Sequence, residues 1–166
     1  EIYGRSFDFL KYLSMCHGED WFQSAVQVCK MKTGYYLQRP MYHYRNIGSS
    51  LSHRYDLESF RLNSDSIFDV KALIAEDGYF DSEVEEMWKA YARKVVNTLL
   101  LALSDSKMSM KEKIGKVRSV TDTDIYKIAI GNDADYGSSK MTVLKFRLLK
   151  NKMYRLLFAL MKSRNL

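Results

Sequence analysis

The fold is decided by the stretch SEVEEMWKAYARKVVNTLLLAL, which runs from Ser82 to Leu103. Its first four residues predict a capping box, because the Ser82 hydroxyl and the Glu85 carboxylate can each satisfy a free backbone N–H at a helix start. No Pro or Gly interrupts the stretch, and both residue types disfavour a helix interior. We therefore expect one helix over residues 82–103.

Similar signals on both sides of this stretch predict a mainly helical chain. Asp56 can cap a helix that runs to about Asp77, where Gly78 ends it. Three further helices are expected: a short one after the capping box Ser109-Met110-Lys111-Glu112, one over Ile125 to Ile130 with a weaker cap at Thr121 to Asp124, and one long helix from Lys140 to about Arg164. The bulk of the chain after Asp56 is thus expected to be a helical bundle.

The only good strand signal lies before Asp56. Tyr35-Tyr36-Leu37 and Met41-Tyr42-His43-Tyr44 are short aromatic runs, and the residues between them include the single proline of the chain, Pro40. Aromatic residues favour strands, and a proline between two such runs favours a turn. The expected fold class is therefore mainly α with a small β element (α+β), in which a strand pair precedes the helical bundle.

Composition excludes several classes of protein. With 46% apolar and 13% aromatic residues among 166, the chain can bury a sizeable core. Its two cysteines, Cys16 and Cys29, cannot form a disulfide framework, which favours a reducing compartment and makes the cytosol the default. No apolar run approaches the roughly 18 residues of a transmembrane helix, and no signal peptide is recognisable. Since the chain opens on Glu1 rather than Met, we expect it to be a piece of a longer polypeptide.

The net charge of +6 belongs to one terminal segment. Residues 137–166 contain no Asp or Glu and eight basic residues: Lys140, Lys145, Arg147, Lys150, Lys152, Arg155, Lys162 and Arg164. Subtracting these eight from the 26 Lys and Arg leaves 18 against all 20 Asp and Glu, so the rest of the chain is at −2. Cations interleaved with Leu, Phe, Met and Tyr suit a helix that lies on an anionic lipid surface. The alternatives are a bundle helix with one solvated face and a region that meets another subunit.

Two adjacent carboxylates, Glu19 and Asp20, stand at the start of a predicted helix over residues 20–32, which Gly34 stops. Acidic side chains are common at a helix N-terminus, because they interact favourably with the helix dipole and with unpaired N–H groups. Simple capping is therefore one interpretation of this pair. The motifs that follow it offer another.

Three motifs occur in order before Asp56: His17-Gly18-Glu19-Asp20-Trp21, Arg39-Pro40-Met41-Tyr42-His43-Tyr44-Arg45, and Ser49-Ser50-Leu51-Ser52-His53. Their order and spacing resemble the C-terminal part of bacterial family-2 glycosyltransferases of the GT-A type. The resemblance covers residues 1–55, which we interpret as the acceptor-side end of a GT-A domain. Residues 56–166 then form a C-terminal helical subdomain with a basic terminal helix.

The resemblance implies an inverting sugar transfer in which Asp20 is the general base. An alcohol is a poor nucleophile until a positioned base takes its proton, an effect worth roughly 10²- to 10⁴-fold in rate. Glu19 is then expected to bind the acceptor or support the turn. Trp21 could offer a flat apolar face to a sugar ring, although a Trp on an apolar helix face also suits the protein core.

A second group of residues matches the binding of the departing diphosphate. Arg45 and His53 flank the Gly-Ser-Ser loop, and Ser50 and Ser52 could donate hydrogen bonds to phosphate or sugar. The structural alternative is that Arg45 ends an exposed strand and that the two serines only shape a turn. The resemblance also implies a divalent metal, Mg²⁺ or Mn²⁺, with ligands mostly outside this chain, and we assign no metal ligand within it.

The leading hypothesis is therefore a C-terminal fragment of a glycosyltransferase of cell-surface polysaccharide synthesis, inactive by itself. Its partners would be a nucleotide sugar and a glycan or lipid-linked acceptor, and possible locations are the cytoplasm and the inner face of the cell membrane, with Lys140 to Arg164 as the membrane contact. The alternative is a non-catalytic helical interaction module that docks on a membrane or a protein through the same basic helix. We expect no nucleic-acid partner, because no recognised binding signature accompanies the charge.

Overall fold

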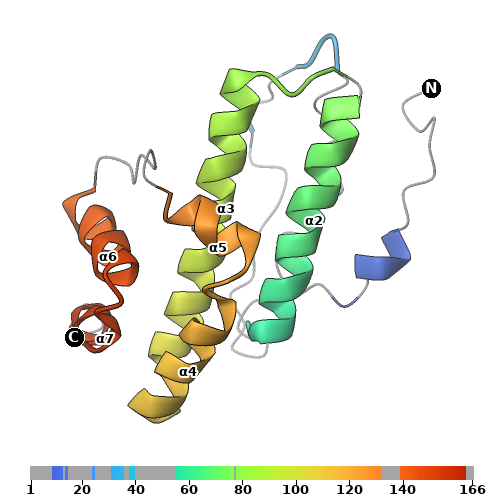
Figure 1. Cartoon of the computed structure of the whole chain (residues 1–166). Helices are drawn as coiled ribbons and strands as arrows, with labels where there is room; N and C mark the ends of the chain where they lie inside the picture. The colour runs from blue at the N-terminus through green and yellow to red at the C-terminus, as the bar shows by residue number, and fades with distance from the viewer. Residues whose placement is uncertain are drawn as a thin grey trace.

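Helices make up the regular structure of the part of the chain that can be described. The computed structural model describes residues 9–12, 14, 24, 31–35, 38–39, 55–76, 78–131 and 139–163. The elements with defined bounds are a 3-10 turn, η1 (Phe9–Tyr12), and the helices α2 (Leu57–Glu76), α3 (Ser82–Asp105), α4 (Met110–Val120), α5 (Asp124–Ala129), α6 (Lys140–Lys150) and α7 (Tyr154–Lys162) (Figure 1).

The mainly α prediction is confirmed, whereas the small β element is absent from the described residues. From the predicted strand pair and its turn, Tyr35, Gln38 and Arg39 are described, and each has irregular backbone and an exposed side chain. The other residues of that pair lie outside the described ranges. Aromatic runs favour strands only where a neighbouring strand pairs with them, and no described residue offers such a partner.

Helix α2 begins and ends where the sequence predicts. The Oδ1 atom of Asp56 accepts a hydrogen bond from the backbone N–H of Ser59 at 2.8 Å, and this bond lowers the pKa of Asp56. Beyond the other end of the helix, Gly78 has a φ of +77°, which glycine adopts without strain. Its N–H donates to the carbonyl of Ala75 at 3.0 Å and so closes the last turn.

The prediction of a capping box at Ser82 is wrong, whereas the prediction of one at Ser109 is confirmed. Asp81 caps α3, since its Oδ1 atom accepts from the backbone N–H of Val84 at 2.9 Å. A carboxylate makes a stronger hydrogen bond to a backbone N–H than a hydroxyl does, so the cap lies one residue earlier than expected. At the start of α4, the Ser109 N–H donates to Glu112 Oε2 at 2.7 Å, and the Glu112 N–H donates back to Ser109 Oγ at 3.3 Å.

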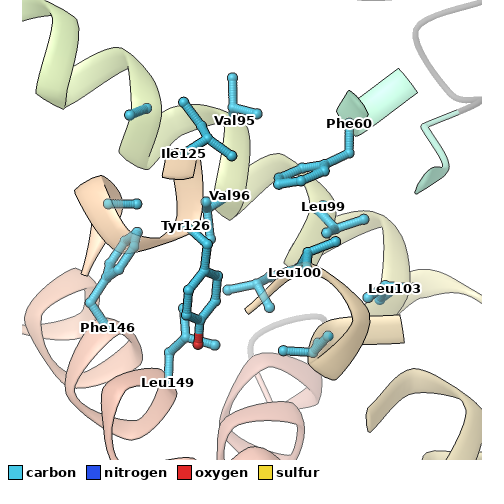
Figure 2. Close-up of a cluster of buried hydrophobic side chains, with 14 of the residues drawn as sticks. Phe60, Val95, Val96, Leu99, Leu100, Leu103, Ile125, Tyr126, Phe146 and Leu149 are labelled. Atoms are coloured by element: carbon cyan, nitrogen blue, oxygen red, sulfur yellow. The ribbon is translucent and has the colours of Figure 1, made fainter. Parts of the chain in front are cut away.

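Helix α3 is the centre of the hydrophobic core. It packs against α2, α4, α5 and α7, and its buried side chains are Trp88, Ala92, Val95, Val96, Leu99, Leu100 and Leu103. The other helices contribute further residues to the same cluster, among them Phe60 from α2, Ile125 and Tyr126 from α5, and Phe146 and Leu149 from α6 (Figure 2). The stretch from which we predicted the fold is therefore the element around which the other helices assemble.

An aromatic cluster joins α3 to α2 near the loop between them. The Nζ atom of Lys71 lies 4.1 Å from the centroid of the Trp88 ring and 4.8 Å from that of Phe80, within the range of cation–π attraction. The Trp88 Nε1 donates to the backbone carbonyl of Ile67 at 3.3 Å. A buried indole usually needs such a partner, so this bond fixes the ring in its orientation.

The last helix, predicted to run unbroken from Lys140 to about Arg164, is two helices. Lys152 between them has a φ of +57°. Its N–H donates to the carbonyl of Leu149 at 3.0 Å, and the N–H of Met153 donates to the carbonyl of Leu148 at 2.9 Å. This pair of bonds is a Schellman motif, which ends a helix. The prediction failed because glycine usually occupies the left-handed position of that motif and here a lysine does.

Candidate functional site

The residues predicted to carry the chemistry lie outside the described ranges. They are Glu19, Asp20, Trp21, Arg45, Ser50, Ser52 and His53. Their assigned roles therefore stay predictions from the sequence. The described residues instead define two other features, a polar junction and a basic surface.

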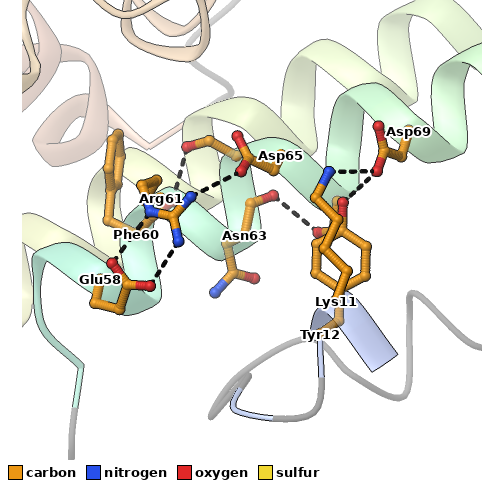
Figure 3. A network of polar contacts seen from close by, with 10 residues as sticks. Lys11, Tyr12, Glu58, Phe60, Arg61, Asn63, Asp65 and Asp69 are labelled. Atoms are coloured by element: carbon orange, nitrogen blue, oxygen red, sulfur yellow. Dashed lines mark hydrogen bonds and ion pairs between the residues drawn. The ribbon is translucent and has the colours of Figure 1, made fainter. Parts of the chain in front are cut away.

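The polar junction ties the N-terminal part of the chain to α2. Tyr12 is buried, and its hydroxyl donates to the Oδ2 atom of Asp69 in the middle of α2 (Figure 3). The Nζ atom of Lys11 donates to the same oxygen at 2.9 Å. The junction thus holds η1 against the helical part, only eight residues before Asp20.

The same contacts favour the protonated forms of both donors. Burial, followed by the hydrogen bond to Asp69, raises the pKa of Tyr12 from 10.0 to about 12. The hydrogen bond to Asp69 also raises the pKa of Lys11 above its ordinary value. At neutral pH the tyrosine is therefore a neutral donor and the lysine a charged one, and both can hold the carboxylate.

Asp122-Thr123-Asp124 has the Asp-x-Asp pattern that can supply two carboxylates to a metal ion. Asp122 is exposed in the turn before α5, and Asp124 is exposed at the first position of that helix. The Oδ1 atom of Asp124 lies 3.5 Å from the Nζ of Lys127, which is an ordinary surface ion pair within one helix. Within the described ranges, no three His, Cys, Asp or Glu side chains are grouped so that they could hold a metal ion.

The basic surface is formed by the exposed side of α6, α7 and the turn between them. Its exposed cations are Lys140, Arg147, Lys150, Lys152, Arg155 and Lys162. The sequence from 139 to 163 contains no Asp or Glu, so no carboxylate of this segment offsets them. The two helices lie on the side of α3 away from α2 (Figure 1). A surface of one charge sign attracts ligands of the opposite sign.

One cation of the terminal segment is not part of the basic surface. Lys145 on α6 is buried at 7% exposure, and its Nζ atom donates to the Oδ1 of Asn97 on α3 at 2.7 Å. A buried ammonium needs polar partners, because leaving water is costly for a charge. Lys145 therefore attaches α6 to the core.

Three large apolar side chains lie among the exposed cations. Leu144 is 43% exposed, Met153 45% and Leu156 54%. The break at Lys152 resets the helical phase, so that each helix buries its own face.

The burial of α7 shows this phase clearly. Tyr154, Leu157, Phe158 and Met161 are buried, and they recur at the spacing of one helix face. Leu156 lies beside Arg155 on the opposite, exposed face. A helical projection that starts again after residue 152 separates the buried residues of α7 from its exposed residues.

Comparison with known proteins assigns no family. No protein-family profile, curated protein or solved structure matches this chain. The glycosyltransferase hypothesis therefore rests on the motifs before Asp56 alone. None of the helices within the described residues is both long enough and apolar enough to cross a bilayer.

Proposed function

We propose that this chain is the acceptor-side end and C-terminal helical subdomain of an inverting family-2 glycosyltransferase. The observation that carries the proposal is the order of three motifs: Gly18-Glu19-Asp20-Trp21, then Arg39 to Arg45, then Ser50 to His53. A single carboxylate pair at a helix start would be weak support, because capping explains it equally well. The ordered set of motifs is more specific than any one of them.

In the proposed reaction, Asp20 acts as the general base toward the acceptor. Its carboxylate takes the proton of an acceptor hydroxyl while the hydroxyl oxygen forms a bond to the anomeric carbon of the donor sugar. The bond from that carbon to the diphosphate breaks, and the nucleoside diphosphate leaves with the bonding electrons. Attack from the face opposite the leaving group inverts the anomeric configuration.

We assign the remaining predicted residues to binding of the acceptor or of the leaving diphosphate. Glu19 and Trp21 are assigned to the acceptor, through a carboxylate hydrogen bond and contact with a sugar face. Arg45 and His53, with Ser50 and Ser52, are assigned to the diphosphate, whose negative charge grows as it leaves. We assign the ligands of Mg²⁺ or Mn²⁺ mostly to residues outside this chain.

The polar junction supports this arrangement of the chain. A general base is effective only when its side chain is held in a fixed position. A residue on a loop meets this condition when a rigid scaffold positions the loop. Tyr12 and Lys11 attach the residues just before the Glu19-Asp20 pair to α2. In this proposal the helical subdomain is the scaffold, and the acceptor is a glycan or a lipid-linked sugar.

The deciding experiment is Asp20→Asn in the complete polypeptide that contains these residues. The amide cannot accept the proton, so the rate of nucleoside diphosphate release with acceptor present should fall by roughly 10²- to 10⁴-fold. The affinity for the nucleotide sugar should stay within about twofold, because the base contacts the acceptor rather than the donor. Both quantities can be measured with a panel of nucleotide sugars.

The matched control is Asp122→Asn, which makes the same chemical change at an exposed position. It should leave diphosphate release unchanged. Full activity in Asp20→Asn would show that this carboxylate only caps its helix. A complete polypeptide that releases no diphosphate from any donor would favour the alternative, a non-catalytic helical interaction module.

A further inference from the structure

We propose that the basic surface of α6 and α7 docks on an anionic lipid bilayer. The occupant is a membrane surface rather than a single ligand, and the docking requires no chemistry at Asp20. It therefore stands or falls separately from the proposed function. Four observations carry it: the sign of the charge, the exposed apolar side chains, the position of the aromatic rings, and the attachment of the helices to the core.

The segment that forms α6, α7 and the turn between them carries charges of one sign. Exposed cations occur at both ends of α6, in the turn and along α7, with no acidic residue between residues 139 and 163. Other described helices mix the two signs. On α2, for example, Arg61 pairs with Glu58 at 2.7 Å and with Asp65 at 3.3 Å. A surface rich in cations complements anionic lipid headgroups.

Apolar side chains accompany the charge. Leu144, Met153 and Leu156 are each between 43% and 54% exposed, although burying such side chains is normally favourable. Leu144 shares a face of α6 with Lys140 and Arg147, at the i, i+4 and i+7 positions. Side chains placed in this way can enter the boundary between headgroups and acyl chains while the cations stay at the headgroups.

The positions of the aromatic residues favour a lipid surface over single-stranded nucleic acid. Proteins that bind single-stranded nucleic acid without sequence preference stack bases on exposed aromatic rings. The aromatic residues of α6 and α7 are Phe146, Tyr154 and Phe158, and all three are buried in the core. The exposed side therefore offers aliphatic and thioether groups, which suit acyl chains.

The surface is already formed in the folded chain. The face of α7 opposite the basic surface packs against α3 and α4, and Leu157 in that face is fully buried. The hydrogen bond from Lys145 to Asn97 attaches α6 to α3. Docking therefore needs no unfolding of the bundle, and substitutions on the exposed side can be tested without removing core contacts.

The experiment is flotation of the full chain with phosphatidylcholine vesicles, with and without about a third of phosphatidylglycerol. We expect binding to the anionic vesicles that added salt weakens, because salt screens exposed charges. The triple variant Lys140→Gln, Arg155→Gln and Lys162→Gln removes three of the exposed cations of the basic surface. Its partition coefficient on anionic vesicles should fall on the order of 100-fold, from the usual contribution of each cation near a lipid surface.

The matched control removes the same number of positive charges from another surface. Lys107, Lys111 and Arg118 are exposed in or next to α4. Replacing all three with glutamine changes the net charge by the same amount and should reduce binding far less. An equal loss in both triple variants would overturn the proposal, because only the total charge would then matter.

The apolar part of the proposal has its own variant. Leu156 lies on the exposed side of α7, and Leu156→Gln keeps every charge. This substitution should weaken vesicle binding about tenfold, which is consistent with the transfer of a partly exposed leucine out of water. Circular dichroism checks that each variant keeps its helices. No binding of the native chain to anionic vesicles would overturn the proposal, and so would tighter binding to an RNA or DNA oligonucleotide than to those vesicles.

Discussion

At the scale of single residues, Asp69 is a position where described residues of the N-terminal part of the chain contact the helical part. Its carboxylate accepts from the buried Tyr12 hydroxyl and from Lys11. Nothing in the local sequence of α2 distinguishes Asp69 from Asp65, which pairs with Arg61 of its own helix. The difference lies in the partner, which comes from residues 57 or 58 positions away along the chain.

We expect Tyr12→Phe to lower the free energy of unfolding by about 1–2 kcal/mol, because it removes a hydrogen bond to a charged acceptor and keeps the ring. Equilibrium unfolding in urea measures this change. Tyr79→Phe is the control, since Tyr79 is 46% exposed, and it should cost less than about 0.5 kcal/mol. Equal losses in the two variants would contradict the importance of the junction.

The pH dependence of stability tests the same residue. The pKa of Tyr12 is raised from 10.0 to about 12, so its contribution is fully present below pH 10 and is lost as the pH rises through 12. The free energy of unfolding of the native chain should fall over that window. The fall should be smaller in Tyr12→Phe, although not absent, because burial also raises the pKa of Tyr55 and Tyr126.

At the scale of elements, the turn that ends α6 contains a residue whose backbone conformation is unfavourable for an amino acid with a Cβ. Lys152 has a φ of +57°, which costs a residue with a Cβ roughly 1–2 kcal/mol. The equivalent position after α2 holds Gly78, with a φ of +77°. The two helices thus end in the same way, with a glycine in one motif and a lysine in the other.

We expect Lys152→Gly to raise the free energy of unfolding by about 0.5–1 kcal/mol, because the gain from removing the Cβ exceeds the added freedom of the unfolded chain. Thermal and urea unfolding both report it. Arg147→Gly, within α6, should instead lower stability by about 1 kcal/mol. A loss of stability in Lys152→Gly would show that the helix break is not held in this conformation in solution.

At the scale of the whole molecule, stability depends on how the other helices cover α3. Leu99, in the C-terminal half of α3, is 1% exposed, whereas Leu101, two residues along, is 45% exposed. Leu99→Ala should lower the free energy of unfolding by roughly 2–5 kcal/mol through lost contacts and the cavity that remains. Leu101→Ala should change it by less than about 0.5 kcal/mol. Similar effects of the two substitutions would contradict the described packing of α3.

Much of the helical framework could be predicted because its signals are local. Asp56, Gly78 and the Ser109 capping box act on backbone groups within a few residues, so the sequence alone shows them. The same local reasoning placed the α3 cap one residue late, since both Asp81 and Ser82 can cap a helix. The candidate catalytic residues could be named from motif order, but no local signal gives their mutual geometry.

The sequence by itself determined the helical class of the chain, most helix ends and the resemblance on which the proposed function rests. Only the tertiary structure decided that the basic segment is two helices, that Lys145 faces the core, and that Leu144 and Leu156 face outward. The reason is that caps and turns depend on neighbouring residues, whereas the buried face of a helix depends on what packs against it. Lys145 meets Asn97 across 48 residues of sequence, and no pattern within one helix contains that information.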